Sequence, residues 1–156
     1  MTDDLRELYQ EIILDHGKRP RNLRHPEDAN REAKGNNPLC GDRLTVYLKV
    51  GADGAIDDVA FEGRGCAIST ASASMMTEVL KGKTEAEAHR LFETFQEMCT
   101  SDEFDAAAHD IEDADAIERL QVLAGVRQFP MRVKCATLAW HTMNAALEGE
   151  EKVSTE

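Results

Sequence analysis

Four side chains from three separate parts of the chain have the chemistry to bind a metal together. Cys40 lies in a loop rich in Asn, Pro and Gly, and Asp42 follows two positions later. In an extended chain, residues two apart point the same way, and Gly41 lets the backbone bend between them. Cys66 follows a Gly-Arg-Gly turn and is predicted to begin a helix, whose N-terminus stabilises negative charge. Cys135 is predicted to lie one turn into a later helix.

The surroundings of these residues favour a thiolate metal site. Arg132 precedes Cys135 by three positions, so both share one helix face and the guanidinium could stabilise a thiolate. Three thiolates and one carboxylate form a donor set that suits tetrahedral zinc. However, cysteines scattered along a chain are more often plain buried residues. The spacing alone therefore leaves both interpretations open.

The remaining candidates give weaker signals. Cys99 is predicted to pack within a helix, and Met75 and Met76 are interpreted as core residues rather than a copper site. The histidines have no pairing at ligand spacing and are predicted to lie at the surface or to cap helices: His16, His25, His89, His109 and His141.

A small antiparallel sheet between residues 29 and 63 is predicted to position two of the cysteines. Residues 44–50 alternate apolar and polar side chains, which is the period of a half-buried strand. A Gly-Ala-Asp-Gly turn joins them to a returning strand at 56–61. The loop with Cys40 precedes the first of these strands, and Cys66 follows the second.

Helices account for most of the remaining chain. Residues 84–98 begin with a capping box, in which Thr84 is followed three positions later by Glu87. Pro130 suits the first turn of the last helix. Residues 148–156 are charged and predicted to be a disordered tail. The predicted helices span residues 3–16, 66–81, 84–98, 101–124 (as one or two helices) and 130–147.

Composition and charge argue against several classes of protein. The chain has 156 residues, the size of one domain, and its net charge of −12 argues against nucleic acid, because phosphate binding requires an excess of Lys and Arg. No run approaches the ~20 apolar residues of a membrane span. The acidic N-terminus lacks the positive charge of a signal peptide, so we expect no membrane partner and a cytoplasmic location. The basic residues 18–21 could be a solvated loop or a docking site for an acidic partner.

Three motifs occur along the chain in a recognisable order. They are Leu39-Cys40-Gly41-Asp42, Gly63-Arg64-Gly65-Cys66-Ala67-Ile68-Ser69 and Arg132-Val133-Lys134-Cys135-Ala136-Thr137-Leu138-Ala139-Trp140. Over residues 5–147 the chain resembles the SufU branch of the IscU/NifU-like iron–sulfur scaffold family. The classical branch carries a histidine ligand directly before the third cysteine, where this chain has Lys134. SufU proteins also carry an extra segment between the second and third cysteines, for which the acidic stretch 100–118 is the candidate.

The resemblance implies an α+β fold, in which a small three-stranded antiparallel sheet packs against a layer of helices. It implies a single domain over residues 1–147, followed by the tail. It also implies one Zn²⁺ ion on four ligands: Cys40, Asp42, Cys66 and Cys135.

By the same resemblance, Cys40 would accept persulfide sulfur from a cysteine desulfurase of the SufS type, which would supply a replacement zinc ligand. Arg132 would stabilise the developing charge, and a downstream iron–sulfur scaffold would be the next partner. Two other functions stay open. One is a scaffold for a transient [2Fe–2S] cluster on the same ligands, and the other is a zinc-stabilised module that only activates the desulfurase. Lys134 favours sulfur transfer over the scaffold function.

Overall fold

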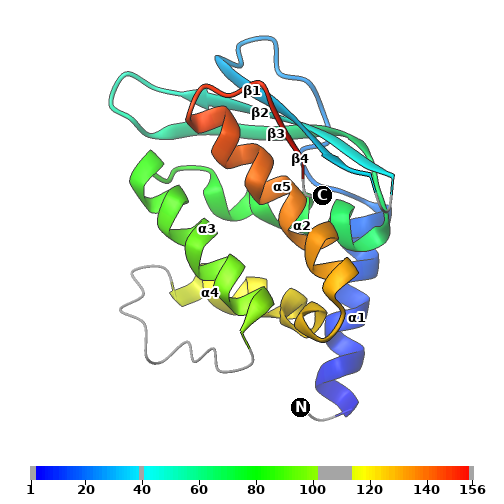
Figure 1. The fold of residues 1–156 in the computed structure, drawn as a ribbon. Coiled ribbons are helices and arrows are strands. Elements are labelled where there is room, and N and C mark those ends of the chain that lie inside the picture. Colours follow the sequence, from blue (N-terminus) through cyan, green and yellow to red (C-terminus); the bar gives the residue numbers. More distant parts are fainter. Residues whose placement is uncertain (1–2, 39–40, 102–113, 155–156) are drawn as a thin grey trace.

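A four-stranded sheet lies against a layer of helices in the computed structural model, which describes residues 3–38, 41–101 and 114–154 (Figure 1). The α+β class predicted from the sequence is confirmed. In chain order the elements are α1 (Asp3–Lys18), β1 (Arg31–Asn37), β2 (Asp42–Val50), β3 (Ile56–Arg64), α2 (Ala67–Leu80), α3 (Glu85–Thr100), α4 (Ala114–Leu120), the 3₁₀ helix η2 (Gln121–Gln128), α5 (Pro130–Leu147) and β4 (Lys152–Ser154).

The sheet is mixed and has the strand order β3-β2-β1-β4. β2 pairs antiparallel with β3 and β1, whereas β4 runs parallel to β1. The prediction of a three-stranded antiparallel sheet is therefore wrong, because residues 152–154 of the supposedly disordered tail form a fourth strand. The backbone N–H of Lys34 donates to the carbonyl of Glu151 at 2.8 Å. The tail thus covers backbone groups at the β1 edge, a long-range pairing that local composition does not reveal.

The long helix α5 lies directly on one face of the sheet. At Gly35 of β1, a Cβ atom would overlap the Thr142 side chain and press on Leu138, both on α5. Glycine is therefore required there by close approach rather than by a turn. Because side chains alternate along a strand, the neighbours of Gly35 point to the opposite face of the sheet.

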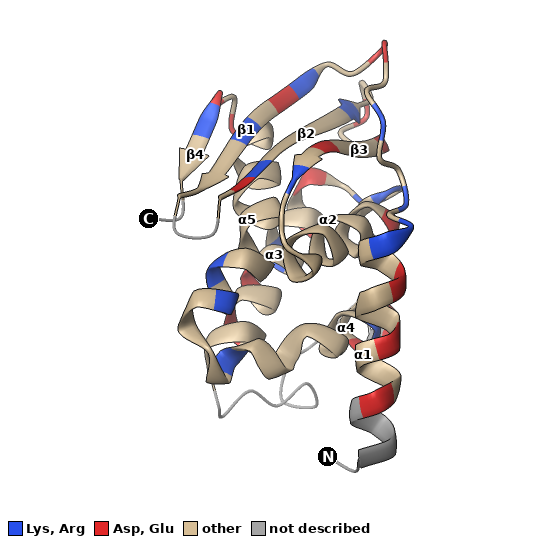
Figure 2. Ribbon diagram, turned by 90° about the vertical axis from the view of Figure 1, so that its right-hand side faces the viewer, with Lys and Arg blue, Asp and Glu red and all other residues tan. Residues whose placement is uncertain are grey.

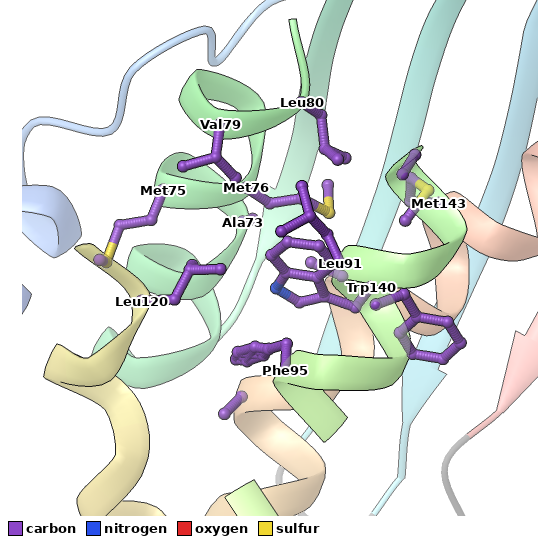
Figure 3. Packing of buried hydrophobic residues seen from close by; sticks show 14 of the residues in the cluster. Ala73, Met75, Met76, Val79, Leu80, Leu91, Phe95, Leu120, Trp140 and Met143 are labelled. Atoms are coloured by element: carbon purple, nitrogen blue, oxygen red, sulfur yellow. The ribbon is translucent and has the colours of Figure 1, made fainter. Parts of the chain in front are cut away.

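The core fills the space between the sheet and helices α2, α3 and α5. Trp140 of α5 is fully buried and stacks on Phe95 of α3 at 4.9 Å between ring centroids. Figure 3 shows Met76 and Leu80 of α2 on the other side of the indole ring. Met75 and Met76 are both buried among apolar residues, so their interpretation as core residues is confirmed. Each large apolar side chain buried in this way contributes roughly 1.5–3 kcal/mol.

The helix predictions are largely confirmed. The capping box at the start of α3 is present, with Glu87 N–H donating to Thr84 Oγ1 and Thr84 N–H donating to Glu87 Oε1. The predicted acidic helices over 101–124 are only partly testable, because 102–113 lie outside the described residues. Beyond them, α4 is followed by a 3₁₀ helix instead of a continuous α-helix. Within the described ranges, no helix is both long and apolar enough to cross a membrane.

A buried histidine fastens α1 to α2. His16 Nδ1 lies 2.7 Å from Ser74 Oγ, and Nε2 lies 3.8 Å from Glu78 Oε1. Because burial disfavours the charged form, the pKa of His16 is lowered below its usual value. The prediction that His16 lies at the surface or caps a helix is therefore wrong. The basic segment after α1 is partly neutralised, since Arg21 pairs with Asp15 at 2.7 Å.

Candidate metal centre

Three of the four predicted ligands converge at one end of the sheet. Asp42 begins β2, Cys66 immediately precedes α2, and Cys135 lies in the second turn of α5. One donor atom from each lies within 4.8 Å of the other two. Cys40 falls outside the described residues, so its place in the site stays a prediction.

Glycines allow β3 to approach β2 closely just before Cys66. Gly63 has a φ of 138°, and a Cβ atom there would overlap the carbonyl oxygen of Arg43. A Cβ atom on Gly65 would lie 3.0 Å from Asp42 Oδ1. Any larger side chain at either position would push Cys66 away from Asp42.

Cys66 is held by hydrogen bonds from both directions. Its backbone N–H donates to Asp42 Oδ1 at 2.9 Å, which joins two of the ligands directly. Its Sγ accepts the Ser69 backbone N–H at 3.4 Å, so the sulfur caps the N-terminus of α2. The predicted helix start at this cysteine is confirmed, and the capping bond fixes the direction of the thiol.

Asn37, which sequence reasoning placed in a loop, is a buried member of the site. It ends β1 directly opposite Asp42. Its Nδ2 donates to Asp42 Oδ2 at 3.3 Å and to Cys135 Sγ at 3.7 Å. Among the described residues, its Oδ1 has no partner. The signal that could have found Asn37 is the strand register, because a short connection after β1 places its last residue beside the first residue of β2.

The donor set and its spacing fit zinc. Zn–S bonds of about 2.3 Å place tetrahedral ligands about 3.8 Å apart, so atoms already within 4.8 Å need only a small adjustment. Asp42 and Cys135 are buried, whereas Cys66 is exposed. The site is therefore supported from inside by protein hydrogen bonds and is open to solvent on the Cys66 side. Thiolate and carboxylate donors would also hold iron.

Three other residues of α5 that bear on the site have their own contacts elsewhere. The Arg132 guanidinium stacks over the Phe129 ring at 4.7 Å from its centroid, so its role toward the site stays a prediction. Lys134 lines a separate cavity of about 250 Å³ with His141. The ring of His141 packs edge-on against Phe92 at 5.0 Å, and burial lowers its pKa.

The remaining cysteine and histidine candidates have contacts outside this centre. Cys99 is buried in the core, where desolvation raises its pKa to about 12 and so disfavours thiolate chemistry. His25 stacks on Tyr47, and His89 lies 2.8 Å from Asn144 Oδ1. His109 lies outside the described residues.

Comparisons with known proteins agree with the fold and the site. The family model described as the NifU-like N-terminal domain matches residues 8–103. The crystal structure of an iron–sulfur cluster assembly scaffold protein for the SUF system from Fervidobacterium islandicum superposes with a TM-score of 0.76 at 33% identity. The match covers 90% of this chain and 97% of that chain.

Two curated relatives are similar over nearly the whole chain. The zinc-dependent sulfurtransferase SufU of Bacillus subtilis is 42% identical over 92% of both chains. The iron–sulfur cluster assembly scaffold protein IscU of Streptococcus pyogenes is 41% identical over 92% of this chain and 85% of its own. The chain therefore belongs to the NifU-like N-terminal domain family, in its SufU and IscU group of iron–sulfur cluster assembly proteins.

Proposed function

We propose that this protein is a zinc-dependent sulfur-transfer protein of iron–sulfur cluster assembly, which accepts sulfur on Cys40 from a cysteine desulfurase of the SufS type. The observation that carries the proposal is the convergence of Asp42, Cys66 and Cys135 within 4.8 Å. The name of the Bacillus subtilis relative supports zinc and sulfur transfer as the specific activity. A downstream iron–sulfur scaffold would receive the sulfur, and the cytoplasm would be the place of the exchange.

Zinc would be held by Cys40, Asp42, Cys66 and Cys135, and when bound it keeps thiol ligands deprotonated near neutral pH. Asn37 would orient two of these ligands, since one amide group donates to both Asp42 and Cys135. The α2 N-terminus would fix the third through the Ser69 N–H bond to the Cys66 sulfur. The chain would thus present a prearranged group of anionic donors at the surface.

The transfer step is redox-neutral. The Cys40 thiolate would attack the outer sulfur of the persulfide on the desulfurase cysteine. The bond between that outer sulfur and the desulfurase cysteine would break, and the desulfurase cysteine would leave as a thiolate. Cys40 would then carry the persulfide. Arg132, exposed at the start of α5, would stabilise the negative charge that moves during this exchange.

A second function, assembly of a transient [2Fe–2S] cluster, is favoured by the name of the Streptococcus pyogenes relative. Cysteine thiolates are the usual ligands of such clusters. Histidine would be the expected additional ligand, but His141 packs against Phe92 and Lys134 lines another cavity. This arrangement supports sulfur transfer as the main proposal. The third possibility, a zinc-stabilised module that only activates the desulfurase, predicts metal without sulfur on Cys40.

The decisive experiment combines metal analysis with mass spectrometry. The protein is purified without oxygen, its zinc, iron and labile sulfide are measured, and it is then mixed with a cysteine desulfurase and cysteine. We expect about one zinc per chain and a mass increase of one sulfur atom on the peptide with Cys40. Stoichiometric iron and sulfide would favour the scaffold function. Zinc with full desulfurase activation, but no sulfur on Cys40, would favour the activating module.

A further inference from the structure

Four cations that form no ion pair with any described residue lie together at the end of the sheet that carries the metal centre. Each strand contributes one, namely Lys152 of β4, Lys34 of β1, Arg43 of β2 and Arg64 of β3. We call this set the cationic row. All four residues are exposed, and among the described residues none of their side chains has a hydrogen bond or an ion pair.

The sheet register places the cationic row on one face. Arg43 is directly opposite Arg64, and Lys34 is directly opposite Lys152. Lys34 also pairs with Thr45, two residues from Arg43, so the two cation pairs are diagonal neighbours. Because Gly35 faces α5, the adjacent Lys34 points to the sheet face away from the helices.

Cations elsewhere around the sheet are neutralised. Arg24 pairs with Asp58 at 2.6 Å, Lys49 with Asp28 at 3.0 Å and Arg31 with Glu85 at 3.2 Å. Like charges directly opposite each other on neighbouring strands destabilise a sheet. The chain has a net charge of −12 and therefore has many acidic residues that could pair with these cations. Two like-charged pairs left side by side indicate a surface that is neutralised by something outside the described fold.

The cationic row lines a cleft of about 930 Å³ beside the metal centre. Gly41 and Gly63 line the same cleft, and Arg43 directly follows the ligand Asp42. Figure 2 shows basic residues on all four strands of the sheet. Two acidic residues lie on the same face. Glu62 accepts a hydrogen bond from the Tyr47 hydroxyl at 2.8 Å, and Glu32 lies two residues before Lys34 on β1.

We propose that the cationic row is the docking surface for an acidic segment of the protein that delivers sulfur to this chain. Four strands spaced about 4.8 Å apart spread the charges over roughly 14 Å, wider than a single phosphate group. In an extended peptide, alternate side chains lie about 6.6 Å apart on one side, so alternating carboxylates would match this spread. An acidic segment bound here would hold its parent protein at the end of the sheet where Asp42 begins β2. The identity of the partner rests on the proposed function. The existence of the charged surface is independent of that function.

The test uses two charge-reversed variants with equal net charge. In the row variant, Lys34→Glu is combined with Lys152→Glu, neither of which is adjacent in sequence to a predicted ligand. In the control variant, Lys18→Glu is combined with Arg19→Glu, in the other basic segment. Each pair changes the net charge from −12 to −16. A third variant, Arg43→Gln with Arg64→Gln, removes the other half of the row without reversing it.

Zinc-loaded proteins are titrated with a fluorescent ten-residue peptide of alternating Glu and Thr, with its Gln counterpart, and with a cysteine desulfurase. We expect the row variant to bind the acidic peptide and the desulfurase about tenfold more weakly, and the control variant to change by less than twofold. Binding of the parent should weaken as salt is raised, because exposed charges are screened. Zinc content is measured for every variant.

Several results would overturn the docking surface. One is desulfurase binding that is unchanged in both row variants, and another is an equal loss in the control variant. A third is tighter binding of tripolyphosphate than of the acidic peptide, which would make the row a compact phosphate site. A different result would show that the proposed function is wrong while the docking surface is right. The desulfurase would then bind through the row and leave no sulfur on Cys40.

Discussion

Replacing Asn37 by Ala should loosen the metal while leaving the fold largely intact. The amide is fully buried and donates to two ligand atoms, Asp42 Oδ2 at 3.3 Å and Cys135 Sγ at 3.7 Å. A hydrogen bond to a charged group contributes about 1.5–3 kcal/mol, and both distances are long enough to favour the lower end. Losing both hydrogen bonds should therefore weaken the zinc-binding free energy by about 3 kcal/mol. Part of this loss is offset, because the buried Oδ1 without a described partner is removed as well.

This estimate corresponds to a zinc affinity about 10–100-fold weaker, the range typical of residues that orient metal ligands. The affinity is measured by competition with a chromophoric chelator, and the stability of the metal-free protein by urea unfolding. Asn36→Ala is the matched control, because Asn36 is the adjacent residue of β1 and points to the opposite sheet face. Asn37→Asp should be worse than Asn37→Ala, since a carboxylate cannot donate and would repel both ligands.

The reasoning would be refuted if Asn37→Ala bound zinc within threefold of the parent protein at unchanged stability. It would also be refuted if Asn36→Ala weakened zinc binding as much as Asn37→Ala. A loss of stability without a loss of affinity would mean that Asn37 only packs against its neighbours.

Three further outcomes follow from the structure. Cys66→Ser should lose zinc whereas Cys99→Ser keeps it, because only Cys66 lies among the converging donors; metal analysis of both proteins checks this. Asp42→Cys should retain zinc but accept sulfur more slowly than the parent, because four thiolates form a closed site; mass spectrometry of the persulfide product follows the rate. Stability should fall as the pH drops below about 6.5, where the unfolded chain protonates a histidine that the fold keeps neutral. For one proton, the free energy of unfolding changes by at most about 1.4 kcal/mol per pH unit, and His16→Asn should flatten this part of the curve. If parent and variant show the same pH dependence of stability, His16 is not its cause.

The fold could be predicted from the sequence where the pattern is local. The alternation over residues 44–50 and the Thr84 capping box each depend on residues close together in the chain, and both predictions are confirmed. The fourth strand could not be predicted in this way. It depends on pairing between Lys34 and Lys152, two like-charged residues far apart in sequence.

In the candidate site, too, motifs along the chain could be recognised, whereas contacts between distant segments could not. Motif resemblance identified Asp42, Cys66 and Cys135, and the structure brings these three together. Asn37 was missed because its role depends on the register between β1 and β2, which its own local sequence does not define. His16 was misplaced for a related reason, since its burial is created by Ser74 on another helix.

The indole of Trp140 gives this protein a built-in optical probe. It is the only tryptophan in the chain, it is fully buried, and its Nε1 has no hydrogen-bond partner among the described residues. An indole in such dry surroundings emits at shorter wavelength than one in water. Because Trp140 lies on the same helix as Cys135, its emission reports whether that helix is packed. Metal loss that leaves the spectrum unchanged would show that the ion occupies a site already supported by a folded core.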